Sequence, residues 1–134
     1  MKKITIFVTL IIAFVGLTVL SGCGRNSYHS TKLAGPYTVD LQIDHNPPVA
    51  GSNNVTVNIK DPANKDVSDA KVVVDYDMPA MPGMPAMSHK ADATLQGNAY
   101  KARIDLMMSG SWTVSVNIDR AGQTQSAKFS IDAR

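Results

Sequence analysis

The sequence of 134 residues contains only one cysteine, and none of its eleven acidic residues is a glutamate. A single cysteine cannot form an intrachain disulfide or supply a cluster of thiolate metal ligands. Glutamate is a good helix former, whereas aspartate favours turns and strand ends, so this bias argues against a helical fold. A nucleophile elbow, a His-rich metal motif and a glycine-rich phosphate loop are also missing, and we therefore expect no enzymatic activity.

The chain has little excess charge of either sign. Its thirteen basic residues include Lys2 and Lys3, and thirteen less these two leaves eleven, against eleven acidic residues. Such scattered and balanced charges form no basic surface for nucleic acid and no cluster of Lys and Arg for anionic lipid headgroups. We therefore expect no nucleic-acid partner and no electrostatic attachment to a membrane.

The amino-terminal segment has the order of a secretory signal peptide: Lys2 and Lys3, an uncharged apolar stretch over residues 4–20, and then small residues. The sequence Leu-Ser-Gly-Cys at residues 20–23 resembles the lipobox of bacterial lipoproteins. We therefore predict a signal peptide over residues 1–22 and a covalent lipid on Cys23. The lipid would anchor the protein outside the cytoplasm, on the periplasmic face in a cell with two membranes or on the surface in a cell with one. The alternative is an uncleaved membrane helix, because seventeen apolar residues are near the lower limit for a span.

After the cysteine, the sequence divides into a short linker and one domain. Residues 24–35 are polar and lack periodicity, and we predict a flexible tether over residues 23–35 that includes His29 as a solvated residue. About a hundred residues remain, from 36 to 134, which is enough for one domain with one core.

Apolar and polar residues alternate in seven stretches of this domain, which is typical of half-buried strands. These strands are predicted around residues 37–43, 55–59, 72–76, 91–95, 100–106, 112–118 and 127–131. Seven short strands separated by turns predict an all-β, immunoglobulin-like sandwich of antiparallel strands. If successive strands run in opposite directions, the connections after the first, third and fifth strands share one end. We expect the tether to join the other end, so that the methionine-bearing end faces away from the membrane.

One of these connections has an unusual composition. Methionine recurs at every third position from Met78 through Met81 and Met84 to Met87, and proline follows the first three. Proline favours extended backbone, and polyproline II has three residues per turn, so we predict a ledge with the four methionines on one face. Successive α-carbons would lie about 9 Å apart on such a ledge. A metal site would then need a bend at Gly83 or ligands from a neighbouring loop.

Thioethers are soft, neutral ligands that bind Cu(I) and have little attraction for Mg²⁺, Ca²⁺ or Zn²⁺. An imidazole suits copper in either oxidation state. We therefore consider a copper site with these candidate ligands: Met78, Met81, Met84, Met87, His89, Met108 and His45. Two alternatives stay open, because methionine also fills gaps in cores and forms adaptable surfaces for protein docking.

Several short pieces occur in a recognisable order: Gly35-Pro36-Tyr37, Pro47-Pro48 with Gly51-Ser52-Asn53, the Met-Pro segment, Gly97-Asn98-Ala99-Tyr100, and the run from Leu106 to Trp112. Together they resemble the YtkA-like domain, which is related to FixH-type envelope proteins, over nearly all of residues 36–134. The resemblance implies an immunoglobulin-like domain of envelope proteins, found also beside metal-efflux adaptor domains. It further implies roles in copper handling or oxidase assembly.

Two functions follow as expectations. The first is a non-enzymatic, lipid-anchored module that binds or passes copper, as Cu(I), through the methionine segment. The second is an interaction module that docks on a metal-efflux or oxidase-assembly complex without binding metal itself.

Overall fold

The computed structural model describes residues 26–134, which form eight strands and no helix. The strands are β1 (Tyr28–Ala34), β2 (Tyr37–Ile43), β3 (Gly51–Lys60), β4 (Lys71–Met78), β5 (Met87–Gln96), β6 (Ala99–Leu106), β7 (Gly110–Arg120) and β8 (Gln123–Ala133). All neighbouring strands are antiparallel, so the predicted all-β antiparallel class is confirmed. Residues 26–134 include no helix long and apolar enough to cross a bilayer. The predicted signal peptide and the lipid on Cys23 lie outside the described residues.

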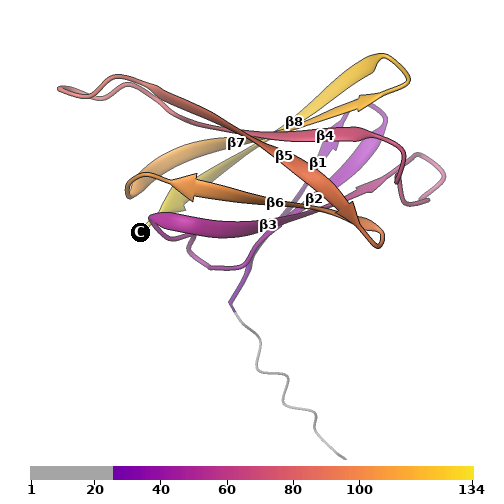
Figure 1. The fold of residues 1–134 in the computed structure, drawn as a ribbon, viewed down its shortest axis with the longest axis horizontal. Coiled ribbons are helices and arrows are strands. Elements are labelled where there is room, and N and C mark those ends of the chain that lie inside the picture. The colour runs from indigo at the N-terminus through magenta and orange to yellow at the C-terminus, as the bar shows by residue number, and fades with distance from the viewer. Residues whose placement is uncertain (1–25) are drawn as a thin grey trace, which may run out of the picture.

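The strands form one hydrogen-bonded sheet in the order β1-β2-β3-β6-β5-β4-β7-β8, which folds over on itself (Figure 1). The sheet turns from one layer to the other at strand β5. The first part of β5, residues 87–93, pairs with β4, and only its last part, residues 94–96, pairs with β6. Strand β1 contacts β8 at the opposite edge. The result is a sandwich-like barrel whose two layers enclose one core.

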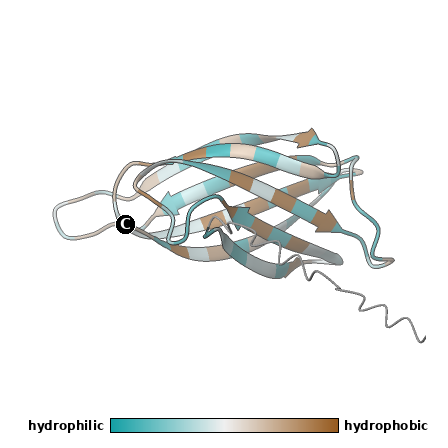
Figure 2. Cartoon of the chain, turned by 90° about the horizontal axis from the view of Figure 1, so that it is seen from below, coloured by the Kyte–Doolittle hydropathy of each residue, from teal (hydrophilic) through white to brown (hydrophobic). Residues whose placement is uncertain are grey.

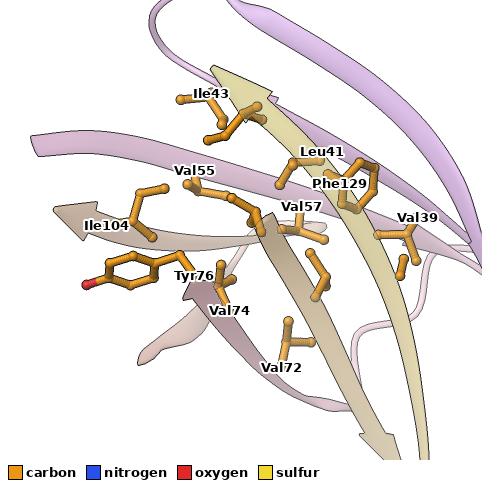
Figure 3. Close-up of a cluster of buried hydrophobic side chains, with 14 of the residues drawn as sticks. Val39, Leu41, Ile43, Val55, Val57, Val72, Val74, Tyr76, Ile104 and Phe129 are labelled. Carbon is orange, nitrogen blue, oxygen red and sulfur yellow. The ribbon is translucent and has the colours of Figure 1, made fainter. Parts of the chain in front are cut away.

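Hydrophobic and hydrophilic residues alternate along most strands (Figure 2), and this alternation places one set of side chains inside and the other in water. The inner set comes from both layers, and part of it is drawn in Figure 3, including Val39, Leu41, Val57, Val74 and Phe129. The largest fully buried side chains are Trp112, Tyr100 and Phe129. A continuous apolar core of this kind accounts for stability without a disulfide.

The tether prediction is wrong for residues 28–34. These residues form β1, which pairs with β2 from Tyr28 opposite Ile43 to Ala34 opposite Tyr37. Only Ala34 in this strand is fully buried, so the sequence shows no apolar alternation there. The strand forms because β2 would otherwise leave a row of backbone N–H and C=O groups unpaired at the edge of the sheet.

Because of strand β1, the predicted position of the methionine-bearing end relative to the preceding chain is also wrong. The three connections at residues 44–50, 79–86 and 107–109 share one end of the strands, as expected (Figure 1). However, β1 reverses the chain, so Tyr28 lies beside Ile43, where β2 runs into the first of these connections. The domain therefore joins the preceding chain at the end that carries the methionines, and not at the opposite end.

The β2–β3 connection is held by Asn53, a buried polar residue of β3. Its side-chain amide donates to the carbonyls of Val49 (2.7 Å) and Gly51 (2.9 Å), and its oxygen accepts from the backbone N–H of Val49 (3.0 Å). We expect Asn53→Ala to lower the free energy of unfolding by about 2 kcal/mol, because it leaves part-buried backbone groups of Val49 and Gly51 without partners. Chemical denaturation would measure this loss. A loss no larger than that of the exposed neighbour variant Ser52→Ala would contradict the role of Asn53.

Candidate metal centre

The methionine segment is the end of a β-hairpin and not a polyproline ledge. Met78 is the last residue of β4 and lies opposite Met87, the first residue of β5. Beyond them, Met81 and Met84 form a further antiparallel bridge, in which each N–H donates to the other's carbonyl at 3.0 and 2.9 Å. The chain reverses through Pro82 and Gly83, whose φ of 83° suits the third position of a type II turn. The hairpin extends beyond the body of the sandwich (Figures 1 and 2).

The predicted polyproline II ledge is wrong because it was based on the prolines and on the three-residue spacing of the methionines. Gly83 adopts a left-handed backbone that lets the chain fold back, and each proline lies where the hairpin forms no ladder hydrogen bond. The hairpin brings the methionine side chains closer together than the ledge would, which favours metal binding. Residues directly opposite in an antiparallel pair have Cβ atoms about 4.5–5.5 Å apart, compared with about 9 Å between successive methionine α-carbons on the predicted ledge. The hairpin thus presents two close pairs of thioethers.

The two pairs differ in exposure. Met78 is 2% exposed and belongs to the core, and Met87 is half-buried against that core. Met81 at the tip is 40% exposed, and its partner Met84 is half-buried. The methyl group of Met78 lies over Gly110, where an added Cβ would approach it to 2.5 Å. The absence of a side chain at Gly110 therefore makes room for the thioether.

His89 lies on the same face as Met78 and Met87. It follows Met87 by two positions on β5, and its cross-strand partner is Tyr76. The imidazole stacks on the Tyr76 ring, with centroids 5.4 Å apart and planes at 25°, and Tyr76 in turn packs 6.2 Å from the ring of Trp112.

Neither Tyr76 nor Trp112 is among the candidate site residues predicted from the sequence. Tyr76 precedes Met78 by two residues, and this spacing already indicates a shared face.

Met108 and His45 occupy two other connections at this end of the strands. Met108 is half-buried against the core, and its carbonyl accepts a hydrogen bond of 3.1 Å from Trp112 Nε1. This bond ties the β6–β7 turn to the ring beside Tyr76. Met107, its neighbour, is 63% exposed.

His45 is exposed, and its Nδ1 lies 2.9 Å from Asp44 Oδ1. Partial burial opposes ionisation of Asp44, but hydrogen bonds from the side chain and backbone of Asn54, together with His45, outweigh it and lower the pKa of the Asp44 carboxyl. The carboxylate therefore stays charged and holds His45 on its own loop. The structure places Met78, Met87 and His89 together and Met81 with Met84, whereas the contacts that fix His45 are made within the β2–β3 region.

Within residues 26–134, no three His, Cys, Asp or Glu side chains are grouped so that they could hold a metal ion. The candidate ligands at the hairpin are thioethers and one imidazole, which suit a soft ion.

A model of the YtkA-like family matches residues 31–117. A search of curated protein sequences gives no significant match. Among solved structures, the chain is similar to "as isolated" FetP from uropathogenic E. coli strain F11, expressed recombinantly in the periplasm of E. coli BL21(DE3). The TM-score is 0.57 at 8% identity, and the match covers 81% of this chain and 97% of that chain. This likeness is one of fold. Because the family model covers more than half of the sequence, the chain belongs to the YtkA-like family.

Proposed function

We propose that this protein is a non-enzymatic copper-binding module of the bacterial envelope, anchored by a lipid on Cys23, that binds or passes Cu(I) through the β4–β5 hairpin. The observation that carries the proposal is the pairing of four methionines, Met78 opposite Met87 and Met81 opposite Met84. Opposite positions bring two neutral, polarisable sulfurs within reach of one ion. Such ligands favour Cu(I) and Ag(I) over harder divalent ions.

The surroundings of the hairpin support retention of an ion. Met78 and Met87 pack against the core, so an ion bound by them would be shielded from water on that side. His89 offers a nitrogen ligand on the same face, and its stack on Tyr76 restrains the ring. Restrained ligands lose less conformational freedom on binding, which raises affinity.

An anaerobic titration of the chain with Cu(I) against a chromophoric chelator would test the proposal. We expect replacement of all four hairpin methionines by leucine to weaken Cu(I) binding at least about 100-fold, since loss of ligands should exceed the 10–100-fold cost of losing an outer partner. Leucine nearly conserves volume, so the fold should persist.

The matched control is Met107→Leu, which removes an exposed thioether outside the hairpin. Equal competition by the wild-type chain and the fourfold variant would refute the copper proposal.

A second candidate function is docking on a membrane protein of efflux or oxidase assembly, favoured by the exposed side chains of Met81 and Met107. Apolar, flexible methionines form adaptable contact surfaces. This function predicts that Met→Leu variants still bind the partner, whereas Met81→Asp weakens capture of the partner from detergent-solubilised membranes. Unchanged capture by Met81→Asp would contradict it.

A further inference from the structure

The two methionine pairs are too far apart along the hairpin to act as one four-sulfur site. Met78 and Met81 are separated by three residues, as are Met84 and Met87, which corresponds to about 10 Å in extended backbone. The two pairs also differ in exposure, since Met78 is buried and Met81 is open to solvent. The hairpin therefore offers two separate positions for a soft ion.

The inner position has three donors of suitable chemistry. Met78 and Met87 are direct cross-strand partners, and His89 lies diagonally from Met78 on the same face of the hairpin. Diagonal neighbours are about 7–8 Å apart at the backbone, a distance that long side chains cover. Gly110 leaves space for the methyl group of Met78, and Tyr76 fixes the plane of the imidazole. Two thioethers and one imidazole form a neutral three-donor set.

The outer position has two donors and few constraints. Met81 and Met84 are held opposite each other by reciprocal backbone hydrogen bonds across the Pro82-Gly83 turn. Their backbone is fixed, but the Met81 side chain is exposed, so an incoming molecule that delivers copper can reach it. Two thioethers without an imidazole should bind Cu(I) more weakly than the inner set and exchange it faster.

We propose, resting on the copper function above, that the hairpin holds Cu(I) at two positions in series: Met81 and Met84 capture and release the ion, and Met78, Met87 and His89 retain it. The inner position lies beside an aromatic pair, since Met78 packs at Gly110 and His89 stacks on Tyr76, which contacts Trp112. Trp112 is the only tryptophan of the chain. Its fluorescence should therefore respond to an ion at the inner position.

The test uses two matched double variants of the full chain, Met78→Leu with Met87→Leu, and Met81→Leu with Met84→Leu. Cu(I) and Ag(I) are the probes, and the readouts are affinity by chelator competition, Trp112 fluorescence, and the rate of transfer to a chelator by stopped flow. We expect the inner variant to lose affinity about 100-fold and to lose the fluorescence response. We expect the outer variant to keep both, with transfer slowed about tenfold.

His89→Phe provides a third measurement, because phenylalanine preserves the stack on Tyr76 but removes the nitrogen donor. We expect it to weaken Cu(I) binding about tenfold and to leave the thermal midpoint unchanged within a few degrees. An affinity equal to wild type would remove His89 from the ligand set and overturn the three-donor assignment.

The outcomes separate the two proposals. If the fourfold Leu variant binds Cu(I) as tightly as wild type, the copper function itself fails. If the fourfold variant loses binding but the two double variants lose it equally, the copper function stands and the division into two positions is overturned. Loss of tight binding in the outer variant alone also overturns it.

Discussion

Replacement of Trp112 by alanine is expected to lower the free energy of unfolding by about 3–5 kcal/mol, the usual cost of deleting a buried aromatic ring. Trp112 is 1% exposed and lies against Tyr76 in the core. Its Nε1 also donates to the Met108 carbonyl, so the variant leaves that carbonyl without its partner. For a domain of about a hundred residues, the thermal midpoint should fall by on the order of 20 °C. Calorimetry and urea denaturation followed by circular dichroism would measure the loss.

Trp112→Phe is the matched control for this prediction. It keeps an aromatic ring beside Tyr76 but removes the donor to Met108, so its cost should be about half that of the alanine variant. If Trp112→Ala costs less than about 1.5 kcal/mol, the ring is not the packing centre of this end of the core.

Ala34→Asp should have an effect of similar size, although it lies in the segment that the sequence predicts to be a flexible tether. Ala34 is fully buried between the layers at the end of β1, and an aspartate there would place a carboxylate in the core without a partner. We expect a loss of about 3–5 kcal/mol, or detachment of β1 from β2. Chemical denaturation measures the loss, and hydrogen exchange of the β1 amides detects the detachment.

Leu33→Asp is the adjacent control, because Leu33 is 72% exposed. It should change the free energy of unfolding by no more than about 0.5 kcal/mol. If residues 28–34 were a flexible tether, neither variant would change the free energy of unfolding. Equal stability of Ala34→Asp and Leu33→Asp would therefore contradict the presence of β1 in solution.

Much of this fold is predictable from alternation alone, because β2, β3, β4, β7 and β8 bury every second residue over most of their length. The pattern Val55, Val57 and Ile59 on β3 is one example, since an inward-facing set of this kind is forced by the pleat. Strand β1 could not be found in this way. Its side chains are mostly polar or exposed, and it forms through backbone hydrogen bonds to β2, which leave no record in hydrophobic periodicity.

The candidate site shows a similar division. The methionines and His89 are visible in the sequence, and their thioether chemistry favours a soft ion. Their pairing was not predicted, because Pro79, Pro82 and Pro85 indicate extended polyproline structure whereas Gly83 permits reversal, and only the reversal brings Met78 opposite Met87. The contact of Tyr76 with His89 depends on the register of the β4–β5 hairpin, and the contact of Tyr76 with Trp112 depends on the pairing of β4 with β7, which is distant in sequence.

Strand β1 has a consequence for the proposed lipid anchor at Cys23. Four residues lie between Cys23 and Tyr28, and the five residue-to-residue steps of extended backbone span at most about 18 Å. Because Tyr28 joins the domain at the methionine-bearing end of the strands, that end would face the bilayer. Partners for metal exchange would then be embedded proteins met by lateral diffusion in the plane of the membrane, rather than freely diffusing carriers.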